Sequence, residues 1–274
     1  MSDRPAKPVL ITGASGNLGR QLARGLGEGW ALRLTDIAAF PDPLPSDATF
    51  TRANLDDGVA ILRLAEGCGS IVHLGGVSSE HPFEEVLGPN IRGLFHIYEA
   101  ARRERARVVF ASSNHAVGFY PRKRKIGTDV TVRPDSRYGV SKAFGEALGA
   151  LYADKHGMIV TCLRIGNVGA RPLDVRRLSI WISPEDIVQL IRIGLEHPDI
   201  RFEILYGASD NAAAWWDNSR ARALGYRPKS KAEDHRAHAE AEQAKIGPDP
   251  VGDLFQGGTF CAAEFTNDVK KAGP

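Results

Sequence analysis

The sequence predicts an α/β fold, a doubly wound parallel sheet with a small C-terminal substrate lobe. Three observations support this prediction. The chain has 274 residues, which suits one large α/β unit. Short apolar runs alternate with amphipathic stretches as far as Ile165. A glycine-rich turn joins the first apolar run to the first amphipathic stretch. Alternation of this kind gives parallel strands connected by right-handed crossovers.

The strands are expected where short runs rich in Val, Ile and Leu occur. These runs cover residues 9–12, 31–36, 49–55, 70–74, 107–111, 160–165 and 201–206. The first helix is expected from Asn17, because apolar residues recur from there at helical spacing. Three further helices are expected over 59–66, 83–103 and 137–156. Another helix is expected at Ser183, which can cap it, with Pro184 at its first position.

The composition is that of an ordinary globular protein and indicates no macromolecular partner. Hydrophobic residues make up 43% and charged residues 25%, and the net charge is +2. The one dense basic run, 122–125, predicts a solvated loop rather than a nucleic-acid site. No apolar run approaches the ~20 residues of a membrane span. Residues 1–8 lack the apolar core of a signal peptide.

The cysteines and histidines predict neither a disulfide framework nor a metal site. Cys68, Cys162 and Cys261 are scattered and fit a reducing cytoplasm, which is the location we expect. His235 and His238 have helical spacing but no third ligand. The aromatic pair at 215–216 belongs either to the core or to an interface, and we expect a homo-oligomer.

The turn at 13–19 has the form of a dinucleotide-binding site. Gly13, Gly16 and Gly19 follow a predicted strand and open a predicted helix. One glycine permits the tight turn, one lets the backbone approach a pyrophosphate, and one lets helix and strand pack closely. The pyrophosphate then lies at a helix N-terminus, where free N–H groups and the helix dipole favour anions. In this context the motif predicts a Rossmann fold that binds NAD(P).

Asp36 selects between the two forms of the cofactor. It ends the second predicted strand, about 20 residues after the glycines, where an acid accepts hydrogen bonds from the adenosine ribose hydroxyls. It would repel a 2′-phosphate, and the neighbouring Ile37 offers no cation. The other interpretation is a solvated acid at a strand end. The sequence predicts NAD rather than NADP.

Tyr138 and Lys142 form a candidate catalytic pair. They lie four residues apart at a predicted helix start, and therefore on one face. A free tyrosine has a pKa near ~10, too high for an effective base at neutral pH. A cation one turn away, together with the positive nicotinamide, would favour the phenolate. Ser113 ends the fifth strand region at the ligand-binding edge and can hydrogen-bond the same substrate oxygen.

In combination, these motifs resemble the extended short-chain dehydrogenase/reductases. The segments 73–76 and 164–167 and the residue Asn90 share the resemblance, which covers about residues 8–210. It implies that Ser113, Tyr138 and Lys142 are catalytic. The residues then expected to bind NAD are Gly13, Gly16, Asn17, Leu18, Asp36, Asn54, Leu55, Leu74, Gly75, Tyr138, Lys142 and Ile165.

Further segments resemble the uronate dehydrogenase family, which oxidises galacturonate and glucuronate at C1 with NAD. These segments are 73–78, 111–115, 176–181, 215–219 and 255–260. The resemblance implies that the sugar is held by Ser78, Ser113, Asn114, His115, Asn167 and Arg176. A guanidinium can bind a uronate carboxylate with two parallel hydrogen bonds. Asn167 stands where some relatives have Ser, and it can still hydrogen-bond a hydroxyl.

Other interpretations remain open at this stage. Arg176 and Arg177 could be exposed loop arginines, and His115 could be a satisfied structural histidine. The chain could be an NAD-dependent sugar epimerase or another sugar dehydrogenase of the same superfamily. It could also be a non-enzymatic NAD sensor, against which the Tyr–Lys pair argues. Dehydratases of the superfamily want an Asp-Glu pair directly after the catalytic Ser or Thr, whereas this chain has Asn114 and His115.

The chain is expected to form a single domain over 1–274. The alternation of strands and helices loosens after Asn167, and there is no internal repeat or obvious linker. Residues 1–168 should form mainly the NAD-binding core, and 169–274 mainly substrate-lobe elements mixed with late core strands. The polar stretch 230–250 predicts an exposed helix and loop.

Overall fold

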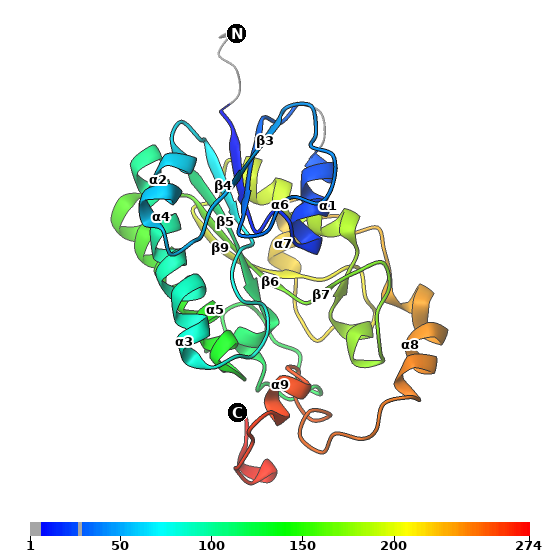
Figure 1. Ribbon diagram of the computed structural model, residues 1–274. Coiled ribbons are helices and arrows are strands. Elements are labelled where there is room, and N and C mark those ends of the chain that lie inside the picture. The colour runs from blue at the N-terminus through cyan, green and yellow to red at the C-terminus, as the bar shows by residue number, and fades with distance from the viewer. Residues whose placement is uncertain (1–6, 27–28) are drawn as a thin grey trace.

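The computed structural model describes residues 7–26 and 29–274, and a seven-stranded sheet lies at its centre (Figure 1). All its neighbouring strands are parallel, in the order β3-β2-β1-β4-β5-β6-β9. The strands are β1 (Val9–Thr12), β2 (Leu32–Asp36), β3 (Ala48–Arg52), β4 (Ser70–His73), β5 (Arg107–Ser113), β6 (Val160–Ile165) and β9 (Phe202–Gly207). The prediction of a doubly wound parallel sheet is confirmed. The strand order reverses between β1 and β4, where sheets of this kind bind ligands beyond the carboxyl ends of the strands.

Helices cover both faces of the sheet, and each face has its own apolar core (Figure 1). Two helices pack together on one face, α1 (Asn17–Leu26) and α6 (Pro184–Glu196). The other face carries α2 (Gly58–Ala65), α4 (Gly93–Glu104) and α5 (Arg137–His156). Ser183 caps α6 by accepting a hydrogen bond from the Asp186 amide, as its sequence predicts.

The stretch 83–103, expected as one helix, is interrupted by a π turn. α3 (Phe83–Val86) leads into η1 (Leu87–Arg92), and α4 follows. Turns of this type often occur at functional sites. Within the turn, the buried Asn90 amide binds both the N–H and the C=O of Val77 and donates to Ser141 Oγ. The π turn therefore fixes the loop after β4 to the helix α5.

Two strands, β3 and β5, differ from the prediction by two or more residues at the carboxyl end. β3 ends at Arg52 rather than at residue 55, because Ala53 still bonds the Asp36 carbonyl but the chain then turns at Asn54. β5 extends to Ser113 rather than 111, because its last two residues pair with β6. Both changes occur at the carboxyl edge of the sheet.

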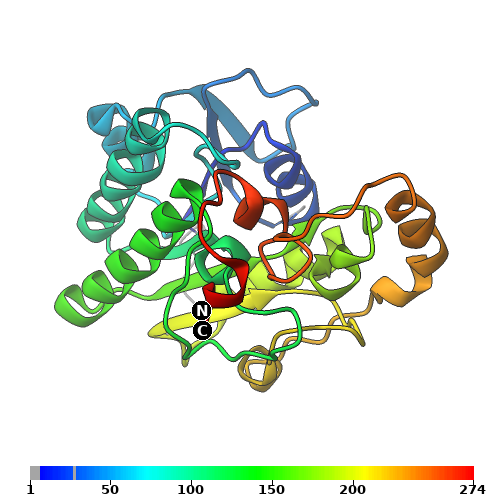
Figure 2. The ribbon, with the colours of Figure 1, turned by 90° about the horizontal axis from the view of Figure 1, so that it is seen from below.

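Short elements that the sequence mostly did not predict complete the fold, and most of them lie in the C-terminal part of the chain. β7 (Asn167–Val168) and β8 (Trp181–Ile182) form a two-stranded parallel sheet. The remaining short helices are η2 (Asn114–Val117), η3 (Arg176–Ser179), α7 (Ser219–Ala223), η4 (Ala232–His235), α8 (Arg236–Gln243), α9 (Thr259–Ala262) and η5 (Val269–Lys271). The expected exposed helix within 230–250 is confirmed as α8. Seen from below, the red C-terminal segment lies across the carboxyl side of the sheet (Figure 2).

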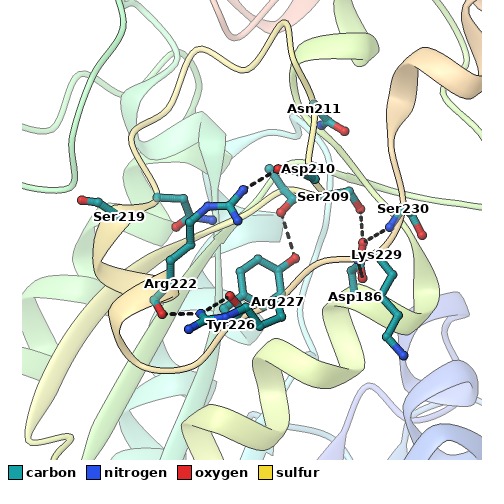
Figure 3. Close-up of polar contacts among 12 residues, drawn as sticks. Asp186, Ser209, Asp210, Asn211, Ser219, Arg222, Tyr226, Arg227, Lys229 and Ser230 are labelled. Carbon is teal, nitrogen blue, oxygen red and sulfur yellow. Dashed lines mark hydrogen bonds and ion pairs between the residues drawn. The ribbon is translucent and has the colours of Figure 1, made fainter.

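Asp186 ties the C-terminal lobe to the core (Figure 3). Its buried carboxylate accepts hydrogen bonds from Ser209 Oγ at 2.6 Å, the Lys229 amide at 2.8 Å and the Ser230 amide at 3.1 Å. A buried carboxylate needs such donors, because an unpaired charge in the interior is costly. One side chain of α6 thus holds two loops of the lobe.

The described residues contain no helix that is both long and apolar enough to cross a membrane. In the same part of the chain, no group of three or more His, Cys, Asp and Glu side chains could hold a metal ion. The expectation that no signal peptide precedes β1 concerns residues 1–8, of which 1–6 lie outside the described residues.

A buried ion pair connects three elements at the carboxyl edge of the sheet. Arg164 of β6 and Glu146 of α5 are 1% and 4% exposed, and two guanidinium nitrogens each lie 2.9 Å from a carboxylate oxygen. Ser112 Oγ of β5 donates to the same carboxylate at 2.6 Å. Although burial lowers the pKa of Arg164, its bonds to Glu146 raise that pKa above the ordinary value. The guanidinium therefore stays charged.

Breaking this pair from one side should destabilise the fold strongly. Arg164→Met leaves the Glu146 charge buried without its partner, so we expect a loss of ~3–5 kcal/mol in the free energy of unfolding, measured by urea denaturation. Arg222→Met, which breaks an exposed pair with Asp210 (48% and 43% exposed), should cost less than ~1 kcal/mol. Equal losses in the two variants would contradict this account.

Candidate active site

The glycine turn and the loop after β4 form one wall of a cavity. Gly13 has φ +69°, and a Cβ there would lie 2.6 Å from the Gly75 nitrogen, so only glycine permits this contact. A Cβ at Gly19 would lie 2.3 Å from the Gly13 carbonyl oxygen, which explains the close packing of α1 on β1. The cavity of about 320 Å³ next to this turn is lined by Thr12, Gly13, Thr35, Asp36, Ile37, Ala53, Asn54, Leu55, Asp56, Gly75, Gly76, Val77 and Pro89.

Asp36 lies at the end of β2 on the rim of this cavity. Its two carboxylate oxygens accept hydrogen bonds from the Ser15 amide at 3.0 Å and the Ala38 amide at 3.1 Å. Each oxygen keeps a lone pair for a further donor. The glycine cradle, the acid and the cavity suit the adenosine half of a dinucleotide. Five of the residues predicted to bind NAD line this cavity: Gly13, Asp36, Asn54, Leu55 and Gly75.

Tyr138 and Lys142 occupy the first two turns of α5, beside the end of β5. Ser136 caps the helix by accepting from the Gly139 amide at 2.9 Å. Lys142 Nζ donates to the Ala111 carbonyl at 2.8 Å and lies 5.4 Å from the centre of the Tyr138 ring. Tyr138 is 8% exposed and Ser113 is 5% exposed. The structure thus brings the three predicted catalytic residues together.

Burial shifts the pKa values of this pair in opposite directions. It raises the pKa of Tyr138 to about 12; a hydrogen bond with Ser113 lowers that pKa, and the charge of Asp135 raises it. Burial also lowers the pKa of Lys142 to about 8. Lys142 is not among the causes that act on the Tyr138 pKa. The expected lowering of the Tyr138 pKa by the lysine charge is therefore not found, and burial dominates that pKa.

Asn114 and His115 begin the turn η2 directly after Ser113. Ser113 Oγ accepts from the His115 amide at 3.2 Å. Asn114 is 2% exposed, and its Nδ2 has no hydrogen-bond partner among the described residues. The His115 ring stacks on Phe260, with ring centres 3.8 Å apart, and meets Tyr138 edge-on at 5.7 Å. An unpaired amide donor and an aromatic wall therefore lie next to the candidate base.

Arg176 is held by the C-terminal segment and is not an exposed loop arginine. Its Nε and Nη2 donate to the Gln256 carbonyl at 2.9 and 2.6 Å. Nη1 has no hydrogen-bond partner among the described residues and remains available to a ligand. Burial, reinforced by the charge of Arg177, lowers the pKa of Arg176 to about 10, so the group is still a cation at neutral pH. Arg177 differs, because Asp174 already pairs with its guanidinium.

The remaining predicted residues lie at the same edge of the sheet. Asn167 begins β7, two residues after the end of β6, and pairs with Trp181 in the small sheet. Ile165 ends β6, whereas Leu74 follows β4. Ser78 is exposed in the loop after β4. It directly follows Val77, whose backbone N–H donates to Asn90. Asn17 and Leu18 begin α1 after the glycine turn.

Three residues at the site were not predicted individually. Asp135 contacts His115, Gln256 holds Arg176, and Phe260 stacks on His115. Gln256 and Phe260 belong to the segment 255–260, which the sequence had singled out only as a resemblance. Their contacts with Arg176 and His115 join parts of the chain that are far apart in the sequence, and no local periodicity signals such contacts.

Comparison with known proteins shows the family of the chain. The model of the NAD dependent epimerase/dehydratase family matches residues 9–192. Uronate dehydrogenase of Pseudomonas putida is 45% identical over 96% of this chain and 98% of its own length. The crystal structure of Agrobacterium tumefaciens uronate dehydrogenase in complex with NAD superposes with a TM-score of 0.88 at 42% identity, covering 96% of this chain and 98% of that one. That of Chromohalobacter salexigens glucuronic acid dehydrogenase gives 0.89 at 38% identity, covering 93% and 97%.

Lys142→Met should make the fold more stable. The folded-state pKa of about 8 lies below the ordinary 10.5, so the charged ammonium disfavours the folded state at all pH values below 8. This shift corresponds to up to ~3 kcal/mol, and loss of the bond to Ala111 offsets part of it. We expect a gain of ~1–3 kcal/mol at pH 7 in urea denaturation.

The pH dependence provides a second check on Lys142. Because the unfolded chain binds one more proton between pH 8 and 10.5, the stability contribution of wild-type Lys142 should rise across that window. The gain from Lys142→Met should shrink correspondingly. Lys155→Met, at an exposed position of the same helix, should change stability by less than ~0.5 kcal/mol at either pH. A destabilised Lys142→Met protein would show that the ammonium is well accommodated.

Proposed function

The chain belongs to the NAD-dependent epimerase/dehydratase family and is an NAD-dependent oxidoreductase; we propose that it oxidises the hexuronic acids galacturonate and glucuronate at C1 to the aldarolactone. The observation that carries this substrate class is the Arg176 guanidinium. It is largely buried at the same edge of the sheet as Tyr138, and one of its nitrogens is left without a protein partner. A carboxylate is the group that best complements such a cation.

In this proposal Tyr138 acts as the base. Its phenolate removes the proton from the anomeric hydroxyl, while Ser113 holds the same oxygen by a hydrogen bond. Bound NAD supplies the chemistry of hydride acceptance from C1. Because burial holds the pKa of Tyr138 at about 12 without cofactor, the phenolate depends on the Ser113 bond and on the positive charge of the nicotinamide. The ring oxygen stays bonded to C1, so the product is a lactone and no water enters the redox step.

The cofactor is assigned to the cavity beside the glycine turn. Gly13, Gly16, Asn17 and Leu18 would face the pyrophosphate at the start of α1. The Asp36 carboxylate would accept from the ribose hydroxyls and exclude a 2′-phosphate. The adenine side is formed by Asn54 and Leu55, and the nicotinamide side by Leu74, Gly75, Ile165 and Lys142.

The substrate is assigned to the residues that surround Tyr138 on the side of the C-terminal segment. Arg176 would donate to the carboxylate from Nη1, and Asn114 and His115 would bind ring hydroxyls, with Ser78 and Asn167 at the margins. We also propose that residues 1–274 act as one domain, because Gln256 and Phe260 complete the site around residues of the core. The proposed cytoplasmic location fits three free, buried thiols. A homo-oligomer is tested by light scattering of the purified protein.

Tyr138→Phe tests the base. The substitution removes only the hydroxyl, so turnover of galacturonate, followed by NADH absorbance, should fall by orders of magnitude, on the scale of ~10²–10⁴-fold for a proton-transfer group. The affinity for NAD, measured by fluorescence titration, should stay nearly unchanged because the cofactor cavity is untouched.

Two outcomes would argue against this assignment. A Tyr138→Phe protein that keeps more than about a tenth of wild-type turnover must use another base, since loss of a proton-transfer group costs at least ~10²-fold. A wild-type protein that holds NAD tightly and never releases NADH would instead indicate an epimerase.

Arg176→Ala tests the substrate class. Galactose has no carboxylate to pair with the guanidinium. In the wild type its kcat/KM should therefore be at least ~10-fold lower than that of galacturonate, as expected from losing a charge-assisted hydrogen bond. Arg176→Ala should remove most of that preference, chiefly by lowering kcat/KM for galacturonate. The measurement is a steady-state comparison of galacturonate, glucuronate, galactose and glucose.

Arg177→Ala is the matched control for this experiment. Its guanidinium is already paired with Asp174, so the substitution should change the preference much less. If wild type and Arg176→Ala discriminate equally between galacturonate and galactose, the carboxylate is bound elsewhere and the assignment of Arg176 is wrong.

A further inference from the structure

A carboxylate with no solvent exposure lies behind the substrate side of the site. The Asp135 side chain is 0% exposed, just before the cap of α5. Two glycines make room for it: a Cβ at Gly118 or at Gly257 would lie 1.8 or 1.9 Å from Asp135 Oδ2. These glycines come from the segments that follow β5 and precede α9. Three distant parts of the chain thus enclose one ionisable group.

The contacts of Asp135 determine where the His115 ring carries its proton. Asp135 Oδ1 accepts from Ser136 Oγ at 2.7 Å, and Oδ2 lies 2.7 Å from His115 Nδ1. Because a carboxylate can only accept, His115 Nδ1 must be the donor. In the neutral ring the other nitrogen, Nε2, then has a free lone pair and is an acceptor.

The acceptor so created belongs to the candidate active site. The His115 ring stacks on Phe260 at 3.8 Å and 25°, which fixes its plane, and its edge meets the Tyr138 ring at 65°. Nε2 has no hydrogen-bond partner among the described residues. Asn114, the preceding residue, contributes a buried Nδ2 donor that is also unpaired. A hydroxyl group satisfies both, since it can donate to one partner and accept from the other.

We propose that Asp135 is a positioning residue for the oxidation proposed above: it holds His115 with Nδ1 protonated, so that Nε2 accepts a hydrogen bond from a ring hydroxyl of the sugar. This inference rests on the proposed function for its substrate and assigns a role to a residue that does not itself touch the sugar. It also implies that the sugar must present a free hydroxyl to Asn114 and His115. An O-methyl group at that ring position cannot donate to Nε2.

The competing explanation is that Asp135 only fastens the C-terminal segment. In that case its removal would damage the site whether or not His115 is present. If Asp135 acts through His115, its removal should matter only while the imidazole is there. A double-mutant cycle separates the two explanations.

The cycle compares wild type, Asp135→Ala, His115→Ala and the double variant, with kcat and KM for galacturonate and the affinity for NAD. Each single variant should lose up to about 10-fold in kcat/KM, the scale of one hydrogen bond between neutral groups. In the His115→Ala background, Asp135→Ala should lower kcat/KM by less than about 3-fold. NAD affinity should be unchanged throughout. Ser136→Ala, which removes the hydrogen bond to the other oxygen of the carboxylate, is the matched control and should change kcat/KM by less than about 3-fold.

A second readout does not depend on turnover. In proton NMR, the His115 Nδ1–H held by a carboxylate should give a low-field imidazole resonance that disappears in both His115→Ala and Asp135→Ala. If Asp135→Ala does not fold, Asp135→Leu, which has a similar branched shape and no hydrogen-bonding atom, takes its place in both experiments.

The outcomes separate this proposal from the proposed function. Equal losses for Asp135→Ala in both backgrounds, or a wild type without the low-field resonance, would overturn the role of Asp135. A wild type that oxidises no uronate would overturn the proposed substrate, while the resonance would still report on the Asp135–His115 contact.

Discussion

The buried pair of Glu146 and Arg164 is the interaction on which the active-site edge of the sheet depends. Glu146 lies one turn beyond Lys142 in α5, and Arg164 precedes Ile165 at the end of β6. Ser112 donates to the same carboxylate, which fixes the end of β5 where Ser113 follows. A charged pair inside a protein persists only when geometry and further hydrogen bonds compensate for the lost hydration. Those requirements leave little freedom in how α5, β5 and β6 meet.

The two halves of the site are built in different ways. The cofactor half comes from short turns in which a backbone must approach closely, as Gly13 approaches Gly75. The substrate half comes from long-range contacts, in which Gln256 holds Arg176 and Phe260 covers His115. The first half is common to dinucleotide-binding sheets. The second depends on the C-terminal segment that crosses the carboxyl side of the sheet (Figure 2), where we expect substrate selection to reside.

The sequence predicted what local pattern controls. The parallel strands, the cap at Ser183 and the Tyr138–Lys142 pair all follow from spacing within one element, and the structure contains each of them. The π turn at η1 could not be predicted, because the Asn90 bonds that accompany it reach Val77 and Ser141. The pairing of β7 with β8 and the burial of Asp135 likewise depend on packing between distant segments. The hydrogen bonds from Arg176 to the Gln256 carbonyl also depend on such packing. The sequence shows that residue 176 carries a charge, but not which group it contacts.

Burial works against charge at three ionisable groups of the candidate site. It raises the pKa of Tyr138 to about 12 and lowers those of Lys142 and Arg176 to about 8 and about 10. In the free protein, therefore, Tyr138 is neutral and the two cations are poorly hydrated. A positively charged cofactor favours the phenolate, and an anionic substrate favours the guanidinium. In the proposed reaction each ligand would therefore supply the charge that one side of the site lacks.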